Sequence, residues 1–352
     1  MKRYSVLARL ACLSLLLAGC GNLSNEDLLF LAAVPRPSDL ELAVTPVDAA
    51  APAATGDSAS AALTLRQALV GQPAEFYLRA DEVAQGINGT VAGVLGFIDR
   101  LGSGHPPTKR TANSRVWGPV HNFDGQQVSI RLEIDRTTRD DGGVRFVFCL
   151  HMTADAAARD AEPSCAEAGA WHAALFGFYD PDTEQTGARA ASGTVTLDFE
   201  AKRLAGDERG TERGTVRVNY DFSAATATRQ LHVESSVPSA SGAGEPRTTT
   251  YDYSRAAERV DFYFAFQANL VGGGWGNLGS TALETATLDA SWSEGGPGRA
   301  DAVLVGGDIA AGESVTATEC WGPLHRRAYY RLTVSAHPAW DELEGNVAAC
   351  PP

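Results

Sequence analysis

Apolar residues recur at every second position in segment after segment from about residue 115 onward, and this alternation constrains the fold most. It is clearest at 128–134, 195–199, 216–222 and 260–266. A period of two is typical of β-strands that bury one face. Further runs bring the predicted strands to about a dozen, at 144–151, 170–179, 229–235, 248–254, 284–292, 300–305, 314–321 and 327–335.

Short turn sequences rich in Gly, Asp and Pro separate these strands, as at 140–143 and 295–298. Strands joined by short turns, without helices between them, run antiparallel. One apolar face per strand means one buried side per sheet, and an open sheet of about a dozen strands curls or splits. We therefore expect a mainly β fold with a strongly curved antiparallel sheet, either a half-barrel or a barrel. Two stacked sheets are the alternative.

One long N-terminal helix is predicted at about 75–101 and expected to pack on the sheet. Its apolar stripe consists of Val83, Ile87, Val91, Val94, Ile98 and Leu101. A second stripe at the same period consists of Gly86, Gly89, Gly93 and Gly96. Glycine costs up to about 1 kcal/mol inside a helix, so this stripe needs a reason. Close packing against the sheet is the favoured one; a flank that borders a cavity or lets the helix bend is the alternative.

The N-terminus has the order of a secretory signal: Lys2, Arg3 and Arg9, then the apolar run 10–17, then small residues. The run is too short to span a bilayer as a helix. Leu17-Ala18-Gly19-Cys20 resembles the lipobox of bacterial lipoproteins. This resemblance implies that residues 1–19 are removed, that Cys20 carries a thioether-linked diacylglycerol, and that its new amino group is acylated. The alternative is an ordinary secretory signal cleaved beside a cysteine.

Residues 20–62 are predicted to form the lipidated cysteine and a disordered tether, because 45–62 is mostly Ala, Pro, Ser, Asp and Gly. The apolar residues 28–31 could instead lie on the lipid surface or on the domain. Residues 63–352 are expected to form a single mainly β domain. In the lipoprotein family an aspartate after the cysteine retains the protein at the inner membrane. Gly21 stands there, so the resemblance implies an extracytoplasmic, lipid-anchored protein at the outer membrane.

Four cysteines remain for disulfides once Cys12 leaves with the signal and Cys20 is lipidated. They are Cys149, Cys165, Cys320 and Cys350, and they allow three pairings. Cys149 ends one apolar run and Cys165 precedes the next, so we expect these two to staple a hairpin. Cys320 would then pair with Cys350 and hold the C-terminal tail. A metal site is the alternative, but the spacings contain no CxxC and no paired histidines.

The charge of the chain excludes one class of partner. Without residues 1–19 the chain keeps 26 Lys and Arg against 43 Asp and Glu, a net charge of −17. Such a surface repels phosphate backbones, so nucleic acid is not expected as a partner. The partners expected are the membrane, through the N-terminal lipid, and a lipid or an envelope protein.

Motifs for catalysis and cofactors have simpler interpretations. The stretch 274–279 fits GxGxxG but precedes a strand rather than a helix, so it predicts a glycine-rich hairpin loop. Asp180, Asp182 and Glu184 lack the spacing of an EF-hand and predict a turn. The histidines are scattered singly, and His232 is expected to face solvent. We therefore predict no catalytic residues, cofactor or metal, and no enzymatic activity, although a catalytic site built from distant residues stays open.

A pentapeptide occurs twice. Trp117-Gly118-Pro119-Val120-His121 is followed 204 residues later by Trp321-Gly322-Pro323-Leu324-His325. Both copies could be turns that lead into a strand, with proline ending one pairing and tryptophan packing on the core. The other hypothesis is that Trp117 and His121 meet Trp321 and His325 in a paired rim, or that the copies descend from a duplication.

A curved antiparallel sheet with one helix, behind a lipid anchor, resembles in architecture the LolA/LolB-type lipoprotein carriers. In that family a concave apolar face accepts acyl chains, but no motif of the family is matched and no residue role is carried over. The leading hypothesis is an envelope lipoprotein that binds a hydrophobic ligand or a partner protein. The alternatives are a structural or interaction module without a ligand, and a surface hydrolase, which would need clustered carboxylates or a histidine dyad.

Overall fold

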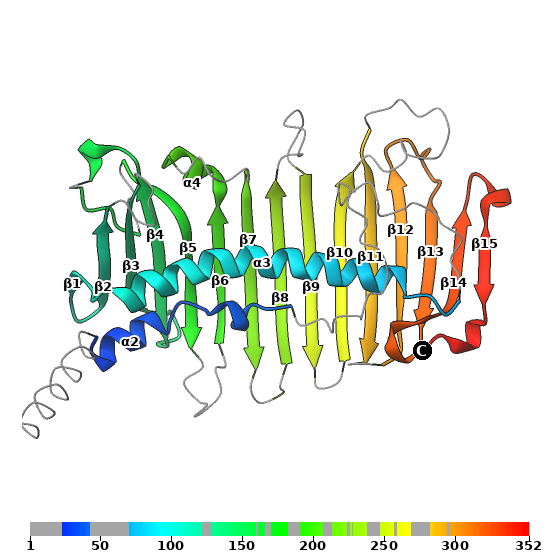
Figure 1. Ribbon diagram of the computed structural model, residues 1–352, viewed down its shortest axis with the longest axis horizontal. Coiled ribbons are helices and arrows are strands. Elements are labelled where there is room, and N and C mark those ends of the chain that lie inside the picture. Colours follow the sequence, from blue (N-terminus) through cyan, green and yellow to red (C-terminus); the bar gives the residue numbers. More distant parts are fainter. Residues whose placement is uncertain are drawn as a thin grey trace, which may run out of the picture. The chain divides into compact units, whose positions relative to one another are not determined.

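The strands are arranged as a meander. The computed structural model describes residues 23–42, 70–121, 128–159, 161–165, 170–181, 191–206, 213–223, 226, 228–237, 247–256, 259–268, 282–293 and 296–351. Within these, 15 antiparallel strands form one sheet in the order of the sequence, β1 to β15 (Figure 1). The first and last strands do not pair with each other, so the sheet is open. The barrel and the two stacked sheets are therefore wrong, and strong curvature stays a prediction.

Two compact units make up the chain, and each is described by itself. The first contains residues 1–39, 92–181 and 201–210; the second contains 40–91, 182–200 and 211–352. The helix α3 (Glu75–Gly104) contributes its N-terminal part to the second unit and the rest to the first. It matches the predicted helix and runs three residues further.

The first unit holds β1 (Lys109–Arg110), β2 (Ser114–Val120), β3 (Ser129–Thr138), β4 (Val144–Thr153) and β5 (His172–Pro181). Adjacent strands pair antiparallel; for example, Ile134 lies opposite Phe148 on β4. Ile130, Leu132 and Ile134 are buried as predicted, but the alternating polar residues of β3 are buried too: Ser129, Arg131 and Glu133. The chain therefore covers this strand on both faces.

Residues 23–42 correct part of the predicted tether. Asn25–Leu31 form helix α2, which begins at a capping box made by Ser24 and Asp27. Phe30 is 0% exposed and contacts Phe146 edge to face at 5.4 Å, so this apolar segment packs on the domain. Asp27 is also fully buried, and it accepts hydrogen bonds from Arg110 and from Arg115. Burial alone would raise the pKa of Asp27, but the hydrogen bonds from Arg110, Ser24 and Arg115 hold it below its ordinary value.

The second unit holds the other ten strands, and adjacent strands again pair antiparallel. They are β6 (Ala191–Asp198), β7 (Thr215–Ser223), β8 (Thr228–Val237), β9 (Arg247–Ala256), β10 (Arg259–Ala268), β11 (Glu284–Ser293), β12 (Gly298–Gly306), β13 (Val315–Trp321), β14 (Arg327–Val334) and β15 (Glu342–Gly345). The short helix α4 (Phe199–Leu204) follows β6. Strands β1, β2 and β15 are not among those predicted from the sequence.

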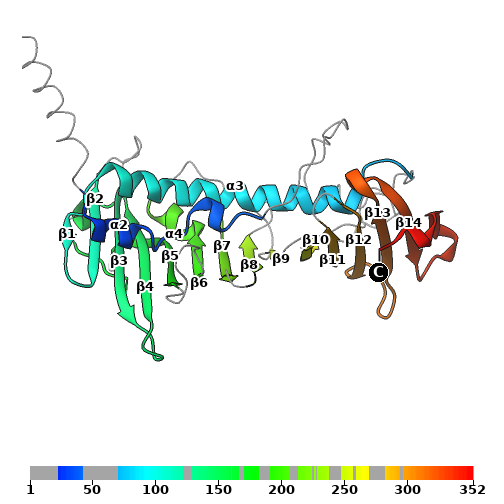
Figure 2. The same cartoon turned by 90° about the horizontal axis from the view of Figure 1, so that it is seen from below.

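The core of the second unit lies between one sheet face and α3, which runs along one side of the strands (Figure 2). Tyr77 on α3 is 0% exposed and contacts Trp292 and Trp321 edge to face, with ring centroids 5.3 and 5.7 Å apart. It also stacks on His325 at 3.7 Å. These side chains fill the space between helix and sheet here.

A buried ion pair lies at the N-terminus of α3. The Glu319 carboxylate, 0% exposed on β13, accepts hydrogen bonds from the backbone N–H groups of Glu75 at 2.9 Å and Phe76 at 2.6 Å. It also forms a short ion pair with Arg327 on β14. Glu319 thus satisfies two N–H groups that would otherwise lack partners at the helix N-terminus.

The glycine stripe of α3 faces open space, which makes the close-packing prediction wrong. A methyl group placed on Gly86, Gly89, Gly93 or Gly96 would meet no atom within 4 Å among the described residues. The buried stripe is instead formed by Tyr77, Ala80, Ala84, Val91, Leu95 and Ile98. Of the predicted apolar stripe, Val91, Ile98 and Leu101 are buried, and Val83 and Ile87 are partly exposed. The side chain of Val94 is not among those that the structure describes.

Candidate functional site

The face of the second unit that points away from α3 carries a row of polar side chains. The register places five residues side by side across β7 to β11: Asn219, His232, Asp252, Tyr263 and Asp289. They occupy the polar positions of strands whose apolar positions are buried under the helix. Each strand alternates polar and apolar side chains, and the pairing places the polar positions of neighbouring strands side by side. Together they form a continuous polar surface.

This row lies in a groove of about 440 Å³. Four aspartates line it, Asp221, Asp252, Asp261 and Asp289, and no lysine or arginine among the described residues does. Asp261 is paired with Arg259 at 2.8 Å. Asp221 and Asp289 make no ion pair with any described residue. The groove is therefore a negatively charged surface with carboxylates available to a ligand.

His232 is held between two carboxylates in this groove. Its Nδ1 lies 2.5 Å from Asp252 Oδ1, and its Nε2 lies 3.4 Å from Glu234 Oε1. Burial would lower the pKa of His232, but the hydrogen bonds to Asp252 and Glu234 outweigh it and raise the pKa. Both ring nitrogens thus face acceptors, which suits an imidazolium that donates twice and leaves no free nitrogen to act as a general base. The sequence indicated the exposure of His232 but not this pairing.

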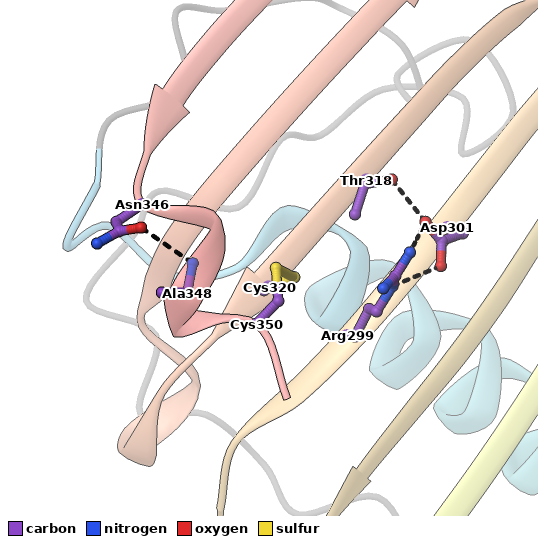
Figure 3. Close-up of a disulfide and its surroundings, with 7 residues drawn as sticks. All are labelled: Arg299, Asp301, Thr318, Cys320, Asn346, Ala348 and Cys350. Atoms are coloured by element: carbon purple, nitrogen blue, oxygen red, sulfur yellow. Dashed lines mark hydrogen bonds and ion pairs between the residues drawn. A yellow bond between two sulfur atoms is a disulfide. The ribbon is translucent and has the colours of Figure 1, made fainter. Parts of the chain in front are cut away.

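Both predicted disulfides are present. Cys149 pairs with Cys165, and Cys320 pairs with Cys350. Figure 3 shows the second disulfide beside an ion pair on the same sheet face, where Arg299 binds Asp301 and Thr318 donates to Asp301. Cys20 lies outside the described residues, so its lipidation stays a prediction.

The repeated pentapeptides lie in different units, so their pairing in a rim stays a prediction. Trp117 on β2 and Trp321 on β13 are each 0% exposed and pack in the cores of their units. The accompanying histidines differ. His121 is exposed, with its Nδ1 2.7 Å from Ser129 Oγ, whereas His325 is buried against Tyr77.

The second pentapeptide has a strained backbone. Leu324 and His325 have φ angles of 61° and 53°, the left-handed region that non-glycine residues avoid. This conformation leaves Leu324 75% exposed while His325 is turned inward.

The remaining motifs are only partly within the described residues. The segment 274–279 lies outside them, as do Asp182 and Glu184. Asp180 is the second-to-last residue of β5 and forms an ion pair with Arg145 at 2.6 Å. Among the described residues, the metal-ligand types that come together are Glu133, Cys149 and Cys165, and both cysteines are in the disulfide.

The buried charges Glu319 and Arg327 were not predicted from the sequence. The sequence contains an indication that Glu319 is buried, because this residue interrupts the apolar alternation of Val315, Ala317 and Trp321. It contains no indication of the partner Arg327, since that pairing depends on the register between β13 and β14.

No protein-family model, curated protein or solved structure matches this chain. Within the described residues, no helix has both the length and the apolar character needed to cross a bilayer.

Proposed function

We propose that this protein is a lipid-anchored envelope lipoprotein that acts as an interaction module, with the groove on β7 to β11 as its binding surface. The lipobox at Cys20 supports the anchor. The groove supports the binding role, because it joins four aspartates on an ordered sheet while the helix-covered face beside Tyr77 is filled by the chain's own side chains. The partner that fits is a basic segment of another envelope protein.

A direct binding assay tests the groove. A fluorescent oligolysine peptide should bind the full chain in detergent and should dissociate with added salt. The double variant Asp221→Asn/Asp289→Asn should weaken binding by about fivefold to tenfold, because exposed charge pairs contribute up to about 1 kcal/mol each. The control Glu82→Gln/Asp99→Asn removes two charges from the exposed side of α3 and should bind like the native protein. Equal loss in both variants would reject the groove as the site.

The anchor is tested separately by metabolic labelling with a palmitate analogue. The native protein should be labelled and should fractionate with membranes, and Cys20→Ser should abolish both. A labelled Cys20→Ser protein would contradict the lipobox assignment.

A hydrophobic ligand is the second candidate, supported by one observation. On the helix-covered side of β9 and β10, three aromatic rings stack in sequence: Tyr251 on Phe264 at 5.5 Å and Phe264 on Phe266 at 4.9 Å. All three side chains are only partly buried. Native mass spectrometry of protein purified from its own host decides between the candidates, since a co-purifying lipid would favour this one.

A further inference from the structure

A cluster of buried polar side chains lies on the face of β3 and β4 that carries the first disulfide. Glu133 and Cys149 are direct partners in the ladder, and so are Arg131 and His151. Their exposed fractions are 9%, 2%, 5% and 1%. Polar groups buried to this extent normally have hydrogen-bond partners. Here Glu133 Oε2, Arg131 Nε and His151 Nδ1 have none among the described residues.

Glu133 lies directly beside the disulfide. One carboxylate oxygen of Glu133 and the sulfur atoms of Cys149 and Cys165 all lie within 4.8 Å of one another. Arg131 approaches Glu133 Oε2 only to 3.8 Å, which is longer than a hydrogen bond. Glu133 is therefore a buried carboxylate that has an oxygen without a hydrogen-bond partner among the described residues and lies in the same group as both sulfurs.

We propose that the reduced form of the Cys149–Cys165 pair is a zinc site, with Glu133, Cys149 and Cys165 as protein ligands and water in the fourth position. Thiolates and a carboxylate are ligands that Zn²⁺ accepts in tetrahedral sites. Two thiolates and Glu133 supply three negative charges, and Zn²⁺ with Arg131 supplies three positive ones. Metal binding thus leaves the buried cluster neutral, whereas the thiolates alone would be buried without compensation.

An external dithiol is the reductant that opens the disulfide. The dithiol is oxidised to its disulfide, the bond between Cys149 and Cys165 breaks, and the two cysteines take up the two electrons and two protons as thiols. Binding of Zn²⁺ then releases both thiol protons to solvent. In the oxidised chain neither sulfur is a thiolate, so the two states exclude each other.

Cobalt titration tests the site. The full chain in detergent is reduced with a phosphine, and Co²⁺ is added while thiolate-to-metal charge-transfer absorption is recorded. The absorption should saturate at one equivalent and disappear when Zn²⁺ is added, and the oxidised chain should show none. Failure of the reduced chain to bind, or loss of its far-ultraviolet circular dichroism on reduction, would overturn the proposal.

Variants assign the ligands. Glu133→Gln should weaken binding by at least about tenfold, since even groups outside the ligand shell change affinity by that much. Asp135→Asn is the matched control, because Asp135 is the next carboxylate on the same face of β3 but is not in the cluster, and it should bind like the native chain. Cys149→Ser/Cys165→Ser should abolish binding, and Cys320→Ser/Cys350→Ser should keep one equivalent. Unchanged binding by Glu133→Gln, or retained binding by Cys149→Ser/Cys165→Ser, would overturn the assignment.

Discussion

At the residue scale, the stability of this protein depends on a few buried charges. Glu319 is fully buried, and burial raises its pKa even though Arg327 and two backbone N–H groups favour its charged form. Breaking a buried pair leaves an uncompensated charge, which is costlier than losing a surface pair. The junction of α3 with β13 and β14 therefore depends on one carboxylate.

Glu319→Gln should lower the free energy of unfolding by about 3–5 kcal/mol, because Arg327 stays buried without its counter-charge. Urea denaturation measures this loss. Glu82→Gln is the control: Glu82 pairs with Arg79 on the exposed side of α3, at 51% side-chain exposure. That variant should change stability by less than about 1 kcal/mol. Similar losses in both variants would contradict the role given to Glu319.

The pKa values of two histidines should lie on opposite sides of the ordinary histidine pKa. The pKa of His151 is lowered to about 4 by burial and by Arg131, whereas that of His232 is raised by Asp252 and Glu234. The contribution of His232 to stability is complete below the unfolded pKa of about 6.5 and is lost as pH rises through its folded pKa. His151 instead destabilises the fold as pH falls from about 6.5 towards 4, because the unfolded chain binds the proton first.

NMR titration of the imidazole C–H signals checks both directions, and His232→Gln and His151→Gln assign the signals. A His232 midpoint below about 6.5 would contradict the pairing with the two carboxylates.

At the element scale, the long helix shows how far a periodic pattern can be interpreted. The spacing of apolar residues predicted its position, and the structure confirms it. The same spacing predicted only part of the buried side: Val91, Ile98 and Leu101 are buried as expected, but alanines such as Ala80 and Ala84 occupy the rest of the contact while the glycines face outward. Small residues suit both a tight contact and an exposed flank, so residue type alone could not distinguish them.

Gly89→Ala and Gly93→Ala should each stabilise the protein by about 0.5–1 kcal/mol, because alanine restricts the unfolded chain and has room in the folded one. Thermal unfolding followed by circular dichroism measures the gain. Gly102→Ala is the opposite control on the same helix, since its new methyl group would collide with Leu31. A loss of stability in Gly89→Ala would contradict the open flank.

At the scale of the whole molecule, an open sheet leaves its last strand with one neighbour. Of the strands that the structure describes, β15 pairs with β14 alone, and the following segment is tied to β13 through Cys350 and Cys320. Cys320 is buried in the second unit, whereas the residues around Val347 are exposed. The disulfide therefore holds a C-terminal segment that packs weakly by itself.

Cys320→Ala/Cys350→Ala should lower stability by about 3–4 kcal/mol, as expected for a closed loop with a sequence separation of 30. Denaturant unfolding gives the change, and limited proteolysis of the variant should produce cuts beyond residue 335 that the native protein does not show. Equal cleavage of this segment in both proteins would indicate that the tail is held by other contacts.

The sequence by itself determined the strand type, the antiparallel order, the long helix and both disulfide pairings. The strands and the helix follow from local geometry, because a period of two or 3.6 is imposed by the backbone and short turns allow only antiparallel neighbours. The disulfides follow from the position of Cys149 and Cys165 between two apolar runs, which leaves Cys320 for Cys350. The tertiary structure decided that the sheet stays open, that alanines and not the glycine stripe of α3 face the core, and which charges meet. Those outcomes depend on register and packing between residues far apart: Glu319 reaches a helix that begins 244 positions earlier, and Asp252 reaches His232 only through the pairing of β8 with β9.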